Sequence, residues 1–150
     1  MAQHLYHMVE AAQWKSCKAQ GTPYYPPTYE ADGFTHLTAD PALLLTVANH
    51  FYTSSVGDWI VLVLDASELT AEVKYEPAAP VGNISSTGVL GGAQRQEAAE
   101  APPEPLFPHL YGSIDFAAVR QELPMQRGLT GSFLSIEGLP AALADGASNP

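Results

Sequence analysis

The chain has 150 residues, a formal net charge of −10 and a hydrophobic fraction of 46 %. This composition is typical of one globular domain and not of a chain that is disordered throughout. Its six basic residues are scattered along the sequence, so they cannot form the patch that neutralises phosphates. We therefore expect no nucleic acid and no membrane among its partners.

The single cysteine, Cys17, cannot form a disulfide within the chain, so we expect the cytoplasm or another reducing intracellular compartment. The first residues lack the basic leader and apolar run of a signal peptide. The longest apolar run, residues 59–64, is too short to cross a bilayer.

The N-terminal segment predicts a strand followed by a helix. Residues 4–9 are strand-like, and residues 10–19 place Trp14 and Cys17 on one helical face. Residues 22–29 contain three prolines, which predict an extended loop.

A second strand and a second helix follow. Residues 33–38 alternate in polarity, which predicts a strand with Phe34 and His36 on one face. Thr38 or Asp40 can cap the helix that comes next. Its apolar stripe at helical spacing consists of Leu43, Leu44, Val47, Ala48 and Phe51.

The rest of the chain is mostly strand-like. Residues 58–65 are apolar and rich in β-branched side chains, which predicts a central strand covered on both faces. Residues 71–76 predict a further strand, and residues 119–123 predict the last one, ended by Pro124. This order predicts an α+β fold: a small, mostly antiparallel sheet with two N-terminal helices.

Two stretches differ in composition from the domain that we expect over residues 1–124. Residues 78–105 are rich in Ala, Gly, Pro, Ser and Glu, and we expect them to form a flexible insertion. Residues 125–150 form a Gly-rich C-terminal extension with one apolar cluster, which would dock on a partner or on the domain itself. Between them, residues 106–114 return to a strand-like composition.

Five short sequences occur in the order seen in one known family: YHMVEAAQW, ADGFTHLTAD, VANHFY, VKYEP and LFPHLYG. Over about residues 4–124 the chain resembles the small, mostly bacterial domain-of-unknown-function family 952. Known members look like a compact fold related to ADP-ribosyltransferases, which split NAD at the nicotinamide–ribose bond. The resemblance thus implies an ADP-ribosyltransferase-like fold, with NAD as a candidate cofactor.

The same resemblance implies roles for individual residues. In the transferases a first-strand histidine holds the ribose, an aromatic residue stacks on nicotinamide, and a late carboxylate stabilises the oxocarbenium-like transition state. His7 and Glu76 are the corresponding candidate catalytic residues. The aromatic partner would be Phe34, Tyr75 or Tyr111.

Three histidines lie on predicted strands beside aromatic residues. If these strands are adjacent with aligned faces, His7, His36, His109 and Glu76 would converge on one cleft. Such a cleft can position a sugar hydroxyl or move a proton near neutral pH. The competing interpretation of each histidine is a ring packed at the core edge and bonded to a backbone carbonyl. No recognised metal-ligand spacing is present, so no metal site is predicted. The candidate ligand-binding residues are His36, His109, Tyr111 and Phe34.

Two functions are compatible with these features. The first is binding or transforming a nucleotide-like or NAD-like ligand in a histidine-lined cleft. The second is a catalytically silent structural subunit that contacts a larger protein assembly through residues 78–105 and 125–150. The scarcity of basic residues for a pyrophosphate favours the second, as do the additions at residues 78–105 and 125–150. The resemblance also places His50 where the family usually has an arginine, which weakens phosphate binding, because histidine lacks the bidentate grip of arginine.

Overall fold

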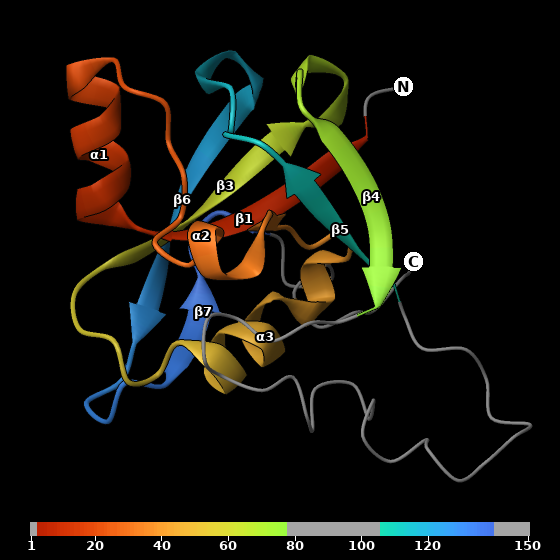
Figure 1. The fold of residues 1–150 in the computed structure, drawn as a ribbon. Helices are drawn as coiled ribbons and strands as arrows, with labels where there is room; N and C mark the ends of the chain where they lie inside the picture. Colours follow the sequence, from red (N-terminus) through yellow and green to blue (C-terminus); the bar gives the residue numbers. More distant parts are fainter. Residues whose placement is uncertain (1–2, 78–105, 140–150) are drawn as a thin grey trace, which may run out of the picture.

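The computed structural model describes residues 3–77 and 106–139 (Figure 1). The insertion expected at 78–105 lies outside the described residues. The described part is α+β, as predicted, and all of its strand pairs are antiparallel. The strands form two sheets rather than one.

The larger sheet has four strands in the order β1-β3-β6-β7. Its strands are β1 (His4–Glu10), β3 (Trp59–Asp65), β6 (Val119–Arg127) and β7 (Phe133–Ile136). Every residue of β3 is buried, which confirms the prediction of a central strand covered on both faces. Val61 and Val63 belong to one core cluster, whereas Leu62 and Leu64 belong to a second cluster on the opposite face.

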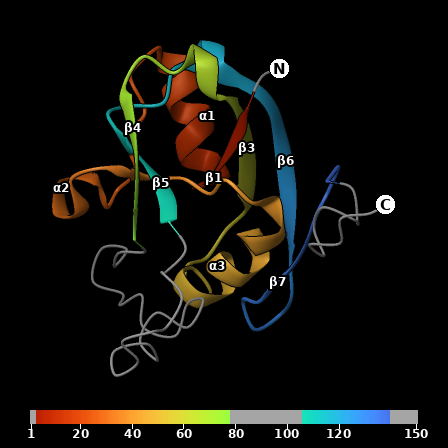
Figure 2. The ribbon, with the colours of Figure 1, turned by 90° about the vertical axis from the view of Figure 1, so that its right-hand side faces the viewer.

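Two helices cover the two faces of this sheet (Figure 2). Helix α1 (Ala11–Gln20) buries Trp14 in the cluster that contains Leu62. Helix α3 (Leu44–Phe51) packs into the cluster that contains Val61. The predicted start of the second helix is confirmed, because the Asp40 side chain accepts a hydrogen bond from the Ala42 N–H in the 3₁₀ turn before α3.

The smaller sheet has three strands in the order β2-β5-β4. These are β2 (Thr35–His36), β5 (Leu106–Tyr111) and β4 (Glu72–Pro77). Leu37 and Leu110 are buried in the second core cluster, so one face of this sheet packs toward β1. Tyr6 and Thr38 exchange two backbone hydrogen bonds of 2.8 Å, which hold the end of β2 beside β1.

The predicted end of the last strand at Pro124 is wrong. Pro124 is the last residue of β6 that pairs with β3, and the pairing with β7 begins at the next residue, Met125. Proline has no N–H to donate, and here it stands where the β3–β6 pairing ends and the β6–β7 pairing begins. Both sets of hydrogen bonds can therefore form without it. The apolar cluster of the expected extension forms β7 and completes the larger sheet, while residues 140–150 lie outside the described part.

The loop predicted over residues 22–29 is free of helix as far as residue 28, and a short helix, α2 (Tyr29–Asp32), begins at its last residue. It is one turn long and ends at Gly33, whose φ of 85° is accessible to glycine at little cost. Among the described residues, no helix is both long and apolar enough to cross a membrane.

Candidate functional site

The His7 side chain lies in the interior between the two sheets. It points to the face of β1 that also carries Leu5 and Val9, and only 4 % of the residue is exposed. Its Nδ1 is 2.7 Å from the His36 backbone oxygen, and its Nε2 is 2.9 Å from the Tyr24 hydroxyl oxygen. Both ring nitrogens are thus bonded within the protein.

Burial fixes the protonation of His7. Removal of the ring from water lowers the pKa of His7 to about 4, so the ring is neutral near pH 7. A carbonyl oxygen can only accept a hydrogen bond, so Nδ1–H donates to His36 and Nε2 accepts from the Tyr24 hydroxyl. This arrangement matches the interpretation of a histidine packed in the core and bonded to a carbonyl.

A pocket of about 160 Å³ lies beside His7, between β1, the start of α1 and the proline-rich loop. Aromatic rings form much of its wall, and none of its lining residues is Lys or Arg. Among residues 3–77 and 106–139, the buried Oε1 atom of Gln13 has no hydrogen-bond partner, although Nε2 of the same side chain donates to the Tyr25 carbonyl at 3.1 Å. The lining residues used below are His7, Gln13, Tyr24, His36, Tyr52 and Trp59.

His36 and His109 lie on the outer face of the smaller sheet. They are direct partners in the β2–β5 register, and their ring centres are 5.6 Å apart. Strand alternation sends the preceding Thr35 and the following Leu110 to the inner face. The Phe34 ring stacks on His109 at 4.0 Å between ring centres. We call His36 and His109 the imidazole pair.

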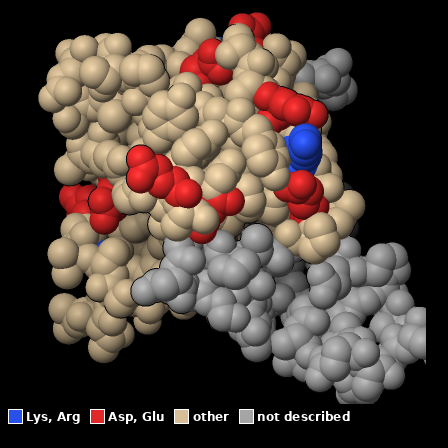
Figure 3. All heavy atoms as spheres, in the orientation of Figure 1, with Lys and Arg blue, Asp and Glu red and all other residues tan. Residues whose placement is uncertain are grey.

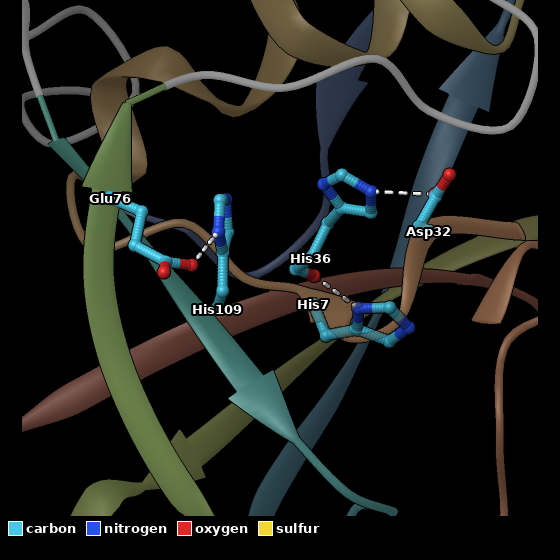
Figure 4. A network of polar contacts seen from close by, with 5 residues as sticks. All are labelled: His7, Asp32, His36, Glu76 and His109. Carbon is cyan, nitrogen blue, oxygen red and sulfur yellow. Dashed lines mark hydrogen bonds and ion pairs between the residues drawn. The ribbon is translucent and has the colours of Figure 1, made fainter. Parts of the chain in front are cut away.

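Each ring of the imidazole pair is bonded to a carboxylate (Figure 4). The distance from His36 Nε2 to Asp32 Oδ2 is 2.8 Å, and the distance from His109 Nδ1 to Glu76 Oε1 is also 2.8 Å. The Tyr111 hydroxyl donates to the same Glu76 oxygen at 2.7 Å. In Figure 4 the two carboxylates lie on opposite outer sides of the two rings.

These contacts shift the protonation of the groups involved. Hydrogen bonds from Tyr111 and His109 lower the pKa of Glu76, and the same carboxylate raises the pKa of Tyr111. Burial lowers the pKa of His36, and the hydrogen bond to Asp32 opposes that effect. Glu76 is therefore ionised near neutral pH.

The structure brings most of the sequence-derived candidates together, but not all of them. His36, His109 and Glu76 form one cluster with Phe34 and Tyr111. His7 is on the other side of β2, and it meets this cluster only through the backbone oxygen of His36. The pocket is lined by His7 and His36 but not by His109 or Glu76. His36 is the residue that the pocket and the cluster share.

Three further residues of this region were not predicted from the sequence. Asp32 could have been suggested by its position four residues before His36, since α2 and Gly33 turn the chain back between them. Gln13 and Tyr24 carry no such signal, because their positions beside His7 depend on how α1 and the loop pack.

The described residues hold no full metal-ligand group, and the face drawn in Figure 3 shows no large basic patch. Within residues 3–77 and 106–139, no three His, Cys, Asp or Glu side chains are grouped so that they could hold a metal ion. On the face drawn in Figure 3, acidic side chains are spread over the surface, and basic ones show mainly in a small patch over β4.

Residues 8–122 match the family described as Protein of unknown function (DUF952). The chain belongs to this family.

Two solved structures with a similar fold are of the protein CC0527 from Caulobacter crescentus. Its crystal structure is 22 % identical, with a TM-score of 0.60 over 87 % of this chain and 93 % of that one. Its solution NMR structure is 23 % identical, with a TM-score of 0.57 over 86 % of this chain and 90 % of that one. No curated protein matches the sequence. At these identities the two solved structures show the fold alone.

Proposed function

We propose that the pocket beside His7 binds one ring of a neutral, nucleoside-like ligand, with His36 at the polar side of the ligand. The observation that carries this proposal is the buried Gln13 Oε1, which has no hydrogen-bond partner in the described part of the chain and belongs to a side chain that lines the pocket. A buried acceptor without a partner costs about 1–3 kcal/mol, and a ligand that donates a hydrogen bond there would remove that cost.

The size of the pocket limits what it can hold. Pockets for whole drug-sized ligands span roughly 300–1,000 Å³. This pocket has about 160 Å³, which suits a single ring rather than a complete dinucleotide. Tyr52 and Trp59, whose rings stack with centres 4.5 Å apart, offer aromatic surface to such a ring.

The charge of the pocket limits its ligand further. No Lys or Arg lines it, and the whole chain carries a net charge of −10. A diphosphate would therefore meet repulsion without a compensating cation. A base or a nicotinamide ring with an amide or amine donor fits these conditions better than the phosphates of NAD.

The relation to ADP-ribosyltransferases belongs to this proposal. By that relation His7 would bind the ribose, and Glu76 would stabilise the positive charge that develops in the transition state. Binding through His7 would require Tyr24 to give up its hydrogen bond, since both ring nitrogens of His7 are bonded within the protein. We therefore propose His36 as the histidine that first meets the ligand. In this arrangement Glu76 does not contact the ligand directly. It is bonded to His109 and Tyr111, and His109 lies beside His36.

Calorimetric titration tests this function with four probes: nicotinamide, adenosine, ADP-ribose and NAD. We expect heat with at least one of the neutral probes and weaker binding of the two diphosphates. Gln13→Leu and His36→Ala should each weaken binding about tenfold or more, because they remove a polar contact. Gln20→Leu is the matched control, since Gln20 is exposed on the same helix. Absence of heat with all four probes would overturn the proposal.

A second candidate function is a subunit of a larger protein assembly. It is favoured by Leu129 and Leu134, which lie in the expected C-terminal extension and are 108 % and 60 % exposed. Val56, on the neighbouring loop, is 87 % exposed and lines the same groove as Leu129. If this function holds, native extracts should contain the protein at a mass above that of the monomer, and Leu129→Ser should reduce that fraction. Recovery as a free monomer alone would count against it.

A further inference from the structure

The imidazole pair has one bonded and one unbonded nitrogen on each ring. An ionised carboxylate can only accept, so His36 Nε2 and His109 Nδ1 carry the protons that point to Asp32 and Glu76. The other nitrogens, Nδ1 of His36 and Nε2 of His109, then present lone pairs. Among the residues that the structure describes, neither of these two nitrogens makes a hydrogen bond.

The two carboxylates bond the imidazole pair from opposite sides. The two nitrogens of an imidazole point in divergent directions, so each unbonded nitrogen faces away from its own carboxylate. In Figure 4, Glu76 lies on the outer side of His109 and Asp32 on the outer side of His36. The His109 residue is only 2 % exposed, so its ring is held among protein groups.

We propose that His36 and His109 chelate a divalent transition-metal ion such as Zn²⁺ or Ni²⁺ through their unbonded nitrogens, with the remaining positions open to water or ligand. Neutral imidazole nitrogens suit these ions. The proposal stands on the cross-strand cluster and does not depend on the ligand pocket beside His7.

The spacing of the rings fits this role. A metal about 2.0–2.1 Å from a nitrogen lies about 3.2 Å from the ring centre, so two coordinated imidazoles have centres about 5 Å apart at a tetrahedral angle and about 6.4 Å apart in line. The observed separation of 5.6 Å lies between these limits. Small rotations of the two side chains are then enough to bring both nitrogens onto one ion.

The surroundings supply the support that such a site needs. Metal-binding histidines usually donate their other N–H to a carboxylate or carbonyl, which fixes the ring and strengthens the donor. Asp32 and Glu76 make these contacts, and Phe34 holds the His109 ring by stacking. No third protein ligand is grouped with the pair among the described residues, so the ion would keep open coordination positions. Since His36 also lines the pocket, those positions would border any bound ring.

Titration of the tag-free protein with zinc chloride, without any other ligand, tests the proposal. We expect one ion per chain, with affinity reduced at least about tenfold by His36→Ala and by His109→Ala. Glu76→Gln should reduce it by about 10-fold, as expected for a supporting carboxylate. His4→Ala is the matched control, because His4 is exposed at the start of β1 and should leave binding unchanged.

A measurement on the wild-type protein covers variants that fail to fold. Paramagnetic Ni²⁺ should broaden the NMR signals of His36 and His109 first. Absence of binding, binding that survives both alanine substitutions, or broadening centred on His4 or His50 would each overturn the proposal. No nucleoside is present in these experiments. A negative result would therefore overturn the metal site without deciding whether the pocket beside His7 binds a ligand.

Discussion

Two histidine environments lie on either side of β2, and they differ in how far the protein satisfies the ring nitrogens. His7 is buried, and both of its nitrogens are bonded to protein groups, the His36 carbonyl and the Tyr24 hydroxyl. In the imidazole pair each ring has one nitrogen bonded to a carboxylate, and the second makes no hydrogen bond within the described part of the chain. A saturated buried ring contributes to stability, whereas a half-bonded ring can still bind a ligand. We therefore expect substitutions at His7 to act on folding and substitutions in the imidazole pair to act on binding.

The largest effect should come from His7→Ala. It leaves a cavity and deprives the Tyr24 hydroxyl and the His36 carbonyl of their buried partner, so we expect a loss of about 3–5 kcal/mol in the free energy of unfolding. Urea denaturation measures it. His7→Gln is the control, because an amide can donate and accept in the same positions and should recover most of the loss. A loss below about 1 kcal/mol would contradict the structural role of His7.

The contribution of His7 should also be measurable in the wild-type protein, as a loss of stability at acidic pH. The pKa of His7 is lowered from 6.5 to about 4 by burial, so between these values the unfolded chain binds a proton that the folded chain does not. Stability is then full above about pH 6.5 and falls as the pH drops toward 4, by about 3 kcal/mol at most. The lowered pKa of His36 acts in the same direction, while Glu76 and Asp65 lose their contribution only at lower pH.

Denaturation at a series of pH values gives this slope. His7→Gln should flatten it over the same window and leave the part due to His36. An unchanged slope in that variant would show that His7 is not the group that titrates.

Tyr24→Phe should have a smaller effect than His7→Ala, since it removes one hydrogen bond and keeps the packing of the ring. We expect a loss of about 1–2 kcal/mol, because Nε2 of His7 is left as a buried acceptor without a donor. Comparison of urea midpoints with an unchanged m-value measures it. Tyr25→Phe is the control, as Tyr25 is 45 % exposed. Equal stability of the two variants would argue against the His7–Tyr24 bond.

Sequence patterns were sufficient where one local rule decides the structure. The apolar run of β3 and the helical stripe with its Asp40 cap are both found as predicted. The short strand β7 was missed, because four residues in a Gly-rich tail carry little periodicity, and its pairing with β6 is a long-range contact. The missing N–H of Pro124 predicts a strand end, but β6 continues through Pro124, because its pairing with β3 ends there and its pairing with β7 begins at the next residue.

For the site, alternation along a strand predicted which residues share a face, but not which faces meet. Phe34 and His36 lie together as expected, with ring centres 4.8 Å apart, although Phe34 stands just before β2. His7 was expected beside Glu76, yet the parity of β1 directs it to the interior face, away from the outer face that carries His109. That choice depends on how the two sheets pack, which no local pattern specifies.

The smallest predicted effect concerns the hydroxyl of Tyr111. It tests the carboxylate that supports the imidazole pair, in contrast to the contacts of His7. The Glu76 carboxylate raises the pKa of Tyr111, because it accepts the hydroxyl proton and would face the negative charge of the ionised ring. Glu76→Gln keeps an acceptor but removes the charge, so the pKa of Tyr111 should move down toward 10. Ultraviolet titration of the phenolate, with Tyr111→Phe to identify the signal, measures the change. If the pKa of Tyr111 is unchanged in Glu76→Gln, the hydrogen bond between Tyr111 and Glu76 is absent in solution. The Glu76 carboxylate would then lack the Tyr111 contact that lowers its pKa and orients it toward His109.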